Sequence, residues 1–238
     1  MRVNWNYIKI LVLLGLTVFL FAFSSKRNAR RDVQAAVIQF EDESSPFVTR
    51  ETVNKLLIQS KDSATGAVKE NLALNYMEAS VKAHPIIKNA DVYVSVSGQL
   101  GVTVRQRKPI ARLNGATSFY LDESGEEMPL SENFAAHVPL VSGVVKKQMP
   151  EVFSLASFLK KDSFLKEHIV GVTYLKSGDY ILTARMLDFK IVLGKINRLE
   201  AKFNNYKAFY QKASKDKTLD NYKTINLKFK NQVVCEQK

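Results

Sequence analysis

The sequence predicts an α+β protein with a single N-terminal transmembrane helix, then a β-α-α-β-β module, then a C-terminal β-rich domain with packed helices. Three observations support this prediction. Residues 7–23 form an apolar run that contains one charge, Lys9. Helical patterns at 49–59 and 69–83 lie between strand patterns at 33–40 and 92–104. After Pro109, strand-like runs outnumber helical patterns, which is typical of a β-rich domain.

The composition excludes several classes of protein. Of 238 residues, 46% are hydrophobic and 24% charged, so global disorder is excluded. The only cysteine, Cys235, can form neither an internal disulfide nor a cysteine-rich zinc site. The net charge is +12, and half of it comes from six basic residues without any acid in residues 1–31. This distribution favours a lipid bilayer over nucleic acid as a partner.

The apolar run is long enough for a membrane anchor. As a helix, residues 7–23 rise about 26 Å, and Ser24 and Ser25 can extend them toward the hydrocarbon thickness of about 30 Å. We therefore expect a cytoplasmic tail over 1–6, a transmembrane helix over 7–25 and a basic linker over 26–32. The expected anchor residues are Trp5, Tyr7, Leu11, Leu14, Phe19 and Phe23.

Two alternatives stay open for this run. The small-x-small triplet at Ala22, Phe23 and Ser24 permits a cleaved signal peptide, although the run is long for one. The orientation is also open from charge alone. Four basic residues follow the run, whereas Arg2, Lys9 and the amino terminus lie at its other end. The positive-inside rule taken alone therefore places the main body in the cytoplasm.

The β-α-α-β-β module begins with a strand over 33–40. Thr49 is the expected N-cap of a helix that ends near Gln59. A second helix over 69–83 ends before Pro85, because the residue before proline avoids the helical region. Alternating runs around Ser97 and Gly98 predict a hairpin. The residues expected to share faces are Ala36, Ile38 and Phe40; Val53, Leu56 and Leu57; Leu72, Tyr76 and Ala79; Val92, Val94 and Val96; and Leu100, Val102 and Val104.

The second domain is expected to be mostly strand. Strand patterns occur at 110–113, 118–121, 169–175, 180–186, 189–194 and 222–229, with another possible at 232–236. Residues 137–143 are interpreted as an irregular crossover. A helix at 151–160 and another at 197–212 show helical apolar spacing. Their expected buried residues are Val152, Leu155, Ala156 and Leu159 in the first and Leu199, Phe203, Tyr206 and Tyr210 in the second.

Nothing in the sequence predicts catalysis. The three histidines, His84, His137 and His168, have no ligand partner three or four residues away. No phosphate-binding glycine loop or nucleophile elbow occurs. The acidic residues of one turn are interpreted as a solvated loop: Asp122, Glu123, Glu126 and Glu127. We expect no catalytic, metal-binding or cofactor-binding residue and no small-molecule substrate.

Several short motifs follow one another along the chain. They are residues 84–92 (HPIIKNADV), 106–111 (QRKPIA), 119–125 (FYLDESG), 138–143 (VPLVSG), 191–195 (IVLGK) with Arg198 and Leu199, and the strand at 222–229. This ordered set behind one amino-terminal anchor resembles the bacterial cell-division family FtsQ, called DivIB in Gram-positive bacteria. The forms at 84–92 and 106–111 are most similar to Bacteroidota-type sequences.

The resemblance implies a POTRA-like domain over 33–107 and a β domain over 108–238. It implies an inner-membrane protein at the division septum, with a cytoplasmic amino terminus and a periplasmic body. FtsQ-like proteins bind FtsB and FtsL and help to place the septal cell-wall synthase, and other divisome membrane proteins are further partners. A non-enzymatic scaffold is therefore expected. The alternatives are a POTRA-containing envelope assembly or secretion factor and an anchored periplasmic hydrolase.

The expected binding mode is strand addition at a terminal edge strand over 222–229. Ile225, Leu227 and Phe229 would share one face and Thr224, Asn226 and Lys228 the other. The family commonly has Asp, Arg and Tyr where this chain has Asn226, Lys228 and Phe229. The full set of expected partner-binding residues is Tyr222, Thr224, Ile225, Asn226, Leu227, Lys228, Phe229 and Val233.

Overall fold

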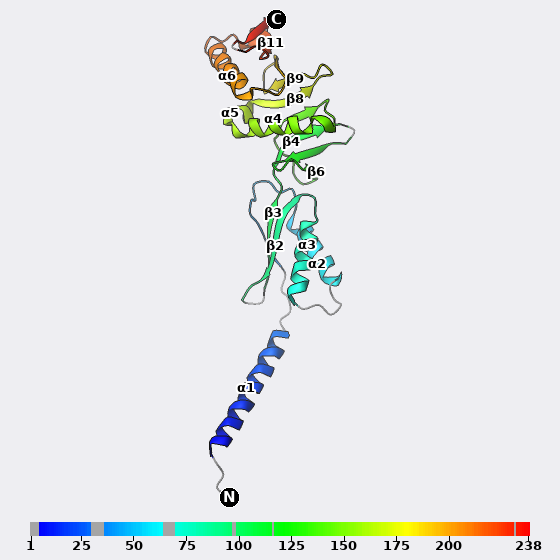
Figure 1. Ribbon diagram of the computed structural model, residues 1–238, viewed down its shortest axis with the longest axis vertical. Coiled ribbons are helices and arrows are strands. Elements are labelled where there is room, and N and C mark those ends of the chain that lie inside the picture. Colours follow the sequence, from blue (N-terminus) through cyan, green and yellow to red (C-terminus); the bar gives the residue numbers. More distant parts are fainter. Residues whose placement is uncertain (1–4, 30–35, 64–69, 97–98, 116, 231) are drawn as a thin grey trace.

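The computed structural model describes residues 5–29, 36–63, 70–96, 99–115, 117–230 and 232–238. The amino-terminal helix, the first sheet with its helices and the second sheet with its helices follow one another along the longest axis (Figure 1). Two domains succeed the helix, and each has its own sheet.

The first element is the helix α1 (Trp5–Ala29). Its described large apolar side chains between Ile10 and Phe23 are exposed, and so is that of Trp5. The side chain of Tyr7, residues 1–4 of the expected tail and residues 30–35 of the expected linker and first strand lie outside the described part. Within the described residues, no helix has both the length and the apolar character needed to cross a membrane.

The first domain has the predicted β-α-α-β-β order. It consists of β1 (Val37–Phe40), α2 (Arg50–Ser63), α3 (Glu70–Lys82), β2 (Ile87–Val94) and β3 (Leu100–Gln106). The sheet order is β1-β3-β2, with β1 parallel and β2 antiparallel to the central strand β3. Both helices lie on the same side of this sheet (Figure 1).

Local sequence explains the start of α2 but not the buried face of α3. The Thr52 amide donates to Oγ1 of Thr49 at 3.2 Å, which confirms Thr49 as an N-cap. The predicted stripe on α3 is wrong, because Tyr76 and Ala79 are exposed and Met77 and Val81 are buried instead. The buried pair belongs to a second apolar stripe at helical spacing. The side chain of Leu72 lies outside the described residues.

The β2–β3 hairpin confirms one predicted face and corrects the other. Leu100, Val102 and Val104 are buried as expected. Val92 is also buried, but Val94 and Val96 on the same predicted face are exposed. Figure 1 shows the reason, since the end of the hairpin diverges from the two helices that cover the sheet. The expected turn residues Ser97 and Gly98 lie outside the described part.

The second domain is built on one mixed sheet of nine strands in the order β12-β11-β10-β9-β8-β7-β4-β5-β6. The strands are β4 (Pro109–Asn114), β5 (Phe119–Asp122), β6 (Glu127–Met128), β7 (Leu140–Ser142), β8 (Ile169–Tyr174), β9 (Tyr180–Ala184), β10 (Lys190–Gly194), β11 (Tyr222–Asn226) and β12 (Val234–Gln237). The helices are α4 (Met149–Lys161), α5 (Ser163–His168) and α6 (Leu199–Lys215), with short 3-10 turns at Lys146–Gln148 and Leu219–Asn221.

The expected irregular crossover at 137–143 is wrong in its central part. It contains β7, which pairs in parallel with both β4 and β8 and so joins the two halves of the sheet. Three residues are too few to show an alternating pattern, and Gly143 ends the strand with a φ of 78°. The four buried residues expected in α4 are confirmed. In α6, Phe203 and Tyr206 are buried and the other two are half-buried.

The two domains share part of one core. Tyr120 and Met128 of the second domain are buried in the apolar cluster of the first. The ring of Phe47 packs edge-on against Tyr120 and Phe134, with centroid distances of 6.1 and 4.9 Å. The carbonyl oxygen of Phe47 also accepts a hydrogen bond from Oγ of Ser131 at 2.6 Å.

The segment between the sheets reinforces this contact. The side chain of Gln106 accepts from the Val48 amide at 2.9 Å and donates to the Ser45 carbonyl at 3.2 Å. Arg107 Nη1 contacts Oδ2 of the buried Asp122 at 2.7 Å. The motif that separates the domains in sequence therefore binds them together in space.

Candidate functional site

The predicted terminal strand is not the edge of the sheet. β11 pairs in parallel with β10 on one side and antiparallel with β12 on the other. The chain reverses direction between β11 and β12, so β12 covers the edge that β11 would otherwise expose. The strand also ends at Asn226 rather than at Phe229. The open edge at this end of the sheet belongs to β12, and β6 forms the edge at the other end.

The expected partner-binding residues therefore have different surroundings. Ile225 and Leu227 are buried in the domain core, so their shared face is the inner face of the sheet. Phe229 lies beyond the strand and is 45% exposed. Val233 packs against the same core from the segment before β12. Tyr222, Thr224 and Asn226 are half-buried in β11.

Two hydrogen bonds determine which backbone groups of β12 face outward. The Leu227 amide donates to the Val192 carbonyl at 2.9 Å. The backbone N–H and C=O groups of odd-numbered residues in this segment therefore point toward β10. Their even-numbered neighbours Thr224 and Asn226 point toward β12 and pair with Glu236 and Val234. The backbone groups of Cys235 and Gln237 consequently point away from the sheet.

A second hydrogen bond shows the same alternation of inward and outward backbone groups along β12. The Lys238 amide donates to the Asn221 carbonyl at 2.9 Å, so even-numbered residues of β12 face inward. An edge strand with alternate amide and carbonyl groups directed outward can pair with another strand. The sequence pattern at 232–236 indicated a possible strand, but it did not indicate which of the two strands would be outermost.

The charges near this edge are mostly paired. Lys228 lies 3.0 Å from Asp179, Lys223 lies 3.4 Å from Glu236, and Lys238 lies 3.5 Å from Asp188. Such exposed pairs stabilise little but shape the local potential. Lys230 is exposed and has no acidic partner among the described residues. Burial raises the pKa of the Cys235 thiol, so this thiol is neutral at pH 7.

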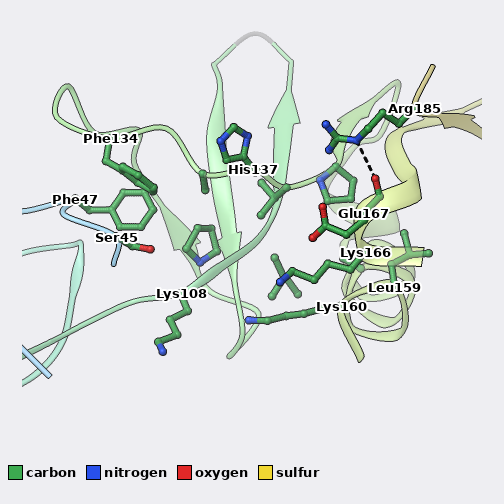
Figure 2. A pocket seen from close by; sticks show the side chains of 16 residues that line it. Ser45, Phe47, Lys108, Phe134, His137, Leu159, Lys160, Lys166, Glu167 and Arg185 are labelled. Atoms are coloured by element: carbon green, nitrogen blue, oxygen red, sulfur yellow. Dashed lines mark hydrogen bonds between the residues drawn. The ribbon is translucent and has the colours of Figure 1, made fainter. Parts of the chain in front are cut away.

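A cavity of about 550 Å³ lies between the two domains (Figure 2). Its apolar lining includes Phe47, Phe134 and Leu159, and its charged lining is largely basic. In Figure 2 the Lys160 and Lys166 side chains extend toward its centre. Arg185 is fixed at its margin because Nε donates to the Glu167 carbonyl oxygen at 2.9 Å.

This cavity does not assemble a pair of carboxylates. Glu167 is the acidic residue of its lining. Within the described residues, no group of three His, Cys, Asp or Glu side chains is placed to hold a metal ion. His137 lines the cavity, whereas His168 is buried elsewhere with Nε2 2.6 Å from the Tyr206 hydroxyl. The carboxylate pair that an anchored hydrolase would need is not found in this cavity.

Comparisons with known proteins identify both domains. Residues 108–236, more than half of the chain, match the family model described as FtsQ/DivIB, C-terminal related. The chain belongs to the FtsQ/DivIB family. Residues 33–105 match the POTRA-like domain, so the module before the nine-stranded sheet is POTRA-like. Among curated proteins, none matches the chain significantly.

Membership in the FtsQ/DivIB family indicates a role in cell division. The family consists of non-enzymatic scaffolds that interact with other division proteins at the septum. The fold agrees with this membership, because a POTRA-like domain precedes a β-rich domain in one α+β chain.

Proposed function

We propose that this FtsQ/DivIB protein is a single-pass inner-membrane scaffold that recruits FtsB- and FtsL-like bitopic proteins for septal cell-wall synthesis. Residues 7–25 anchor it, with residues 1–6 in the cytoplasm and the body in the periplasm. The basic linker covers 26–32, the POTRA-like domain 33–107 and the β domain 108–238.

The anchor is supported by the length and surface of α1. Its 25 residues rise about 37 Å, which exceeds a hydrocarbon core of about 30 Å. The longest stretch of α1 whose side chains are described without a gap is residues 9–24, and this stretch rises only about 24 Å. Trp5, Leu11, Leu14, Phe19 and Phe23 are all exposed, which costs free energy in water but not in lipid.

The partner is recruited by strand addition along β12. The outward backbone groups of Cys235 and Gln237 carry this proposal, because they are the free hydrogen-bonding groups of a terminal edge strand. Val234, the first residue of β12, and Phe229, which precedes the strand, are both exposed and offer apolar contacts. Four of the remaining predicted residues hold β12 through its ladder with the neighbouring strand β11: Tyr222, Thr224, Ile225 and Asn226. The last two lie beyond β11, where the Leu227 amide bonds to Val192 of β10 and Lys228 pairs with Asp179.

A proline substitution tests the open edge. Cys235→Pro removes one outward amide while leaving the inward ladder to β11, a position where edge strands tolerate proline. Cys235→Ala is the matched control, because it removes the same thiol and keeps the amide. We expect co-purification of the FtsB-like protein with the full-length chain to fall about tenfold in the proline variant only.

Three outcomes are informative. If a folded Cys235→Pro variant captures as much FtsB-like protein as the wild type, the partner does not bind at β12. Weaker capture by Phe229→Ala, with unchanged thermal stability, would extend the contact to the segment before β12. Recovery of outer-membrane assembly factors instead of bitopic division proteins would favour the alternative, a POTRA-containing envelope assembly or secretion factor.

A further inference from the structure

The free end of the β2–β3 hairpin carries an unusual concentration of exposed apolar side chains. Among the described residues of the POTRA-like domain, six large apolar side chains are exposed, and four of them lie at this end of its sheet: Val37, Tyr93, Val94 and Val96. Val94 is 52% exposed and Val96 fully exposed. Residues 93–100 contain no charged side chain. Exposed edge strands normally carry charges that prevent association, so this uncharged apolar end is suited to contact with an apolar partner.

The strand register places this surface at the end where the chain enters the domain. Val37, the first residue of β1, pairs with Gly101 at the start of β3. Because these strands are parallel, both begin at the end of the sheet that holds the hairpin tip. Figure 1 shows the hairpin extending toward the α1 side of the domain.

Chain length limits the distance to α1. The helix ends at Ala29, and the eight steps from there to Val37 span at most about 28 Å. If α1 crosses the bilayer, this limit keeps the hairpin end of the sheet within reach of the membrane surface. The sequence of the expected linker is basic, and basic segments next to a membrane helix are attracted by anionic lipid.

Tyr93 gives this tip the chemistry of the bilayer interface. It pairs with Gly101, and its ring occupies the space that a Cβ at Gly101 would need. The ring therefore lies flat over the backbone of β3 and is 45% exposed. Tyrosine is enriched at the level of lipid headgroups because its ring is apolar and its hydroxyl is polar.

We infer that the tip of the β2–β3 hairpin, formed by Tyr93, Val94 and Val96, inserts into the lipid headgroup region and fixes the POTRA-like domain on the membrane. This inference rests on the proposed α1 anchor. The contact is a second point of attachment beside α1, so it restrains the direction in which the β domain and its β12 edge extend from the bilayer.

A fluorescent label at the tip tests this contact. The full-length chain carrying Cys235→Ser and Val96→Cys is labelled with nitrobenzoxadiazole and incorporated into vesicles of equal parts phosphatidylethanolamine and phosphatidylglycerol. We expect a blue shift of emission and quenching by lipids brominated near the headgroup. A label at Val145→Cys, an exposed position of the β domain, is the matched control and should show neither effect.

The outcomes separate the tip from the anchor. Suppose that the chain resists alkaline carbonate extraction but the label at position 96 is as water-exposed as the control. This result would overturn the hairpin contact and leave the proposed anchor in place. Release of the chain by carbonate would overturn both. With the label at Val94→Cys, adding Val96→Asp should abolish the blue shift, and its persistence would show that the apolar tip does not cause the insertion.

Discussion

Asp122 and Arg107 form the best-buried ion pair in the described part of the chain. The aspartate side chain is almost fully buried, and Arg107 Nη1 lies 2.7 Å from Oδ2. Oδ1 accepts hydrogen bonds from the amides of Ser124 and Glu126 at 2.7 and 2.9 Å. The sequence suggested only a solvated acidic turn here, because a sequence pattern cannot show that Arg107 lies beside it.

Asp122→Asn should lower the free energy of unfolding by about 2 kcal/mol, because a partly buried guanidinium loses its countercharge. Denaturant unfolding of the full-length chain in detergent measures this change. Asp188→Asn, at a highly exposed carboxylate, is the control and should change stability little. A loss as small as that of the control would show that the pair does not stabilise the domain junction.

His168 should make stability depend on pH. Burial lowers its pKa from 6.5 to about 4, so it folds as the neutral imidazole. Between pH 6.5 and 4, His168 is protonated in the unfolded chain but neutral in the folded one. The free energy of unfolding is therefore highest above pH 6.5 and falls as the pH drops toward 4. Burial also lowers the pKa of His84, which acts on stability in the same direction.

The contribution of His168 is therefore measured as a difference. Stability of His168→Gln should decline less steeply than that of the wild type between pH 6.5 and 5. Denaturant midpoints at several pH values give the two slopes. Parallel slopes would assign the pH dependence to other groups.

At the scale of elements, long periodic segments were predictable and short or competing ones were not. The face of α4 that contains Val152 and Leu159 was predicted correctly because the helix has one apolar stripe. On α3, two stripes compete, and tertiary packing selects the one with Met77 and Val81. The order of β11 and β12 at the edge was not predictable, since both patterns fit either position.

β7 has only three residues but joins β4 to β8 within the sheet, so its end should be sensitive to substitution. Gly143 has a φ of 78°, and a Cβ there would collide with the Tyr174 carbonyl oxygen of β8. Gly143→Ala should cost about 2 kcal/mol or more of unfolding free energy. Gly115→Ala, which meets no close atom, is the control for denaturant unfolding. Equal stability of the two variants would contradict this role of β7.

At the scale of the whole molecule, the shared core should make the two domains unfold together. Phe47 contacts Tyr120 and Phe134, so Phe47→Ala removes packing from both sides of the junction. We expect a loss of about 3 kcal/mol and one unfolding transition for both domains. Amide hydrogen exchange can follow Val102 and Leu182 as probes of the two sheets. Two separated transitions in the wild type would show independent domains.

A division partner that adds a strand to β12 would change the hydrogen bonding of this strand's backbone amides. Amide hydrogen exchange of the full-length chain, with and without the FtsB-like protein, tests this addition most directly. Strand addition should protect the outward amides of Cys235 and Gln237 in the complex. The inward amides of Val234 and Glu236 should be protected already in the free chain. Binding that leaves Cys235 and Gln237 unprotected would contradict strand addition at this edge.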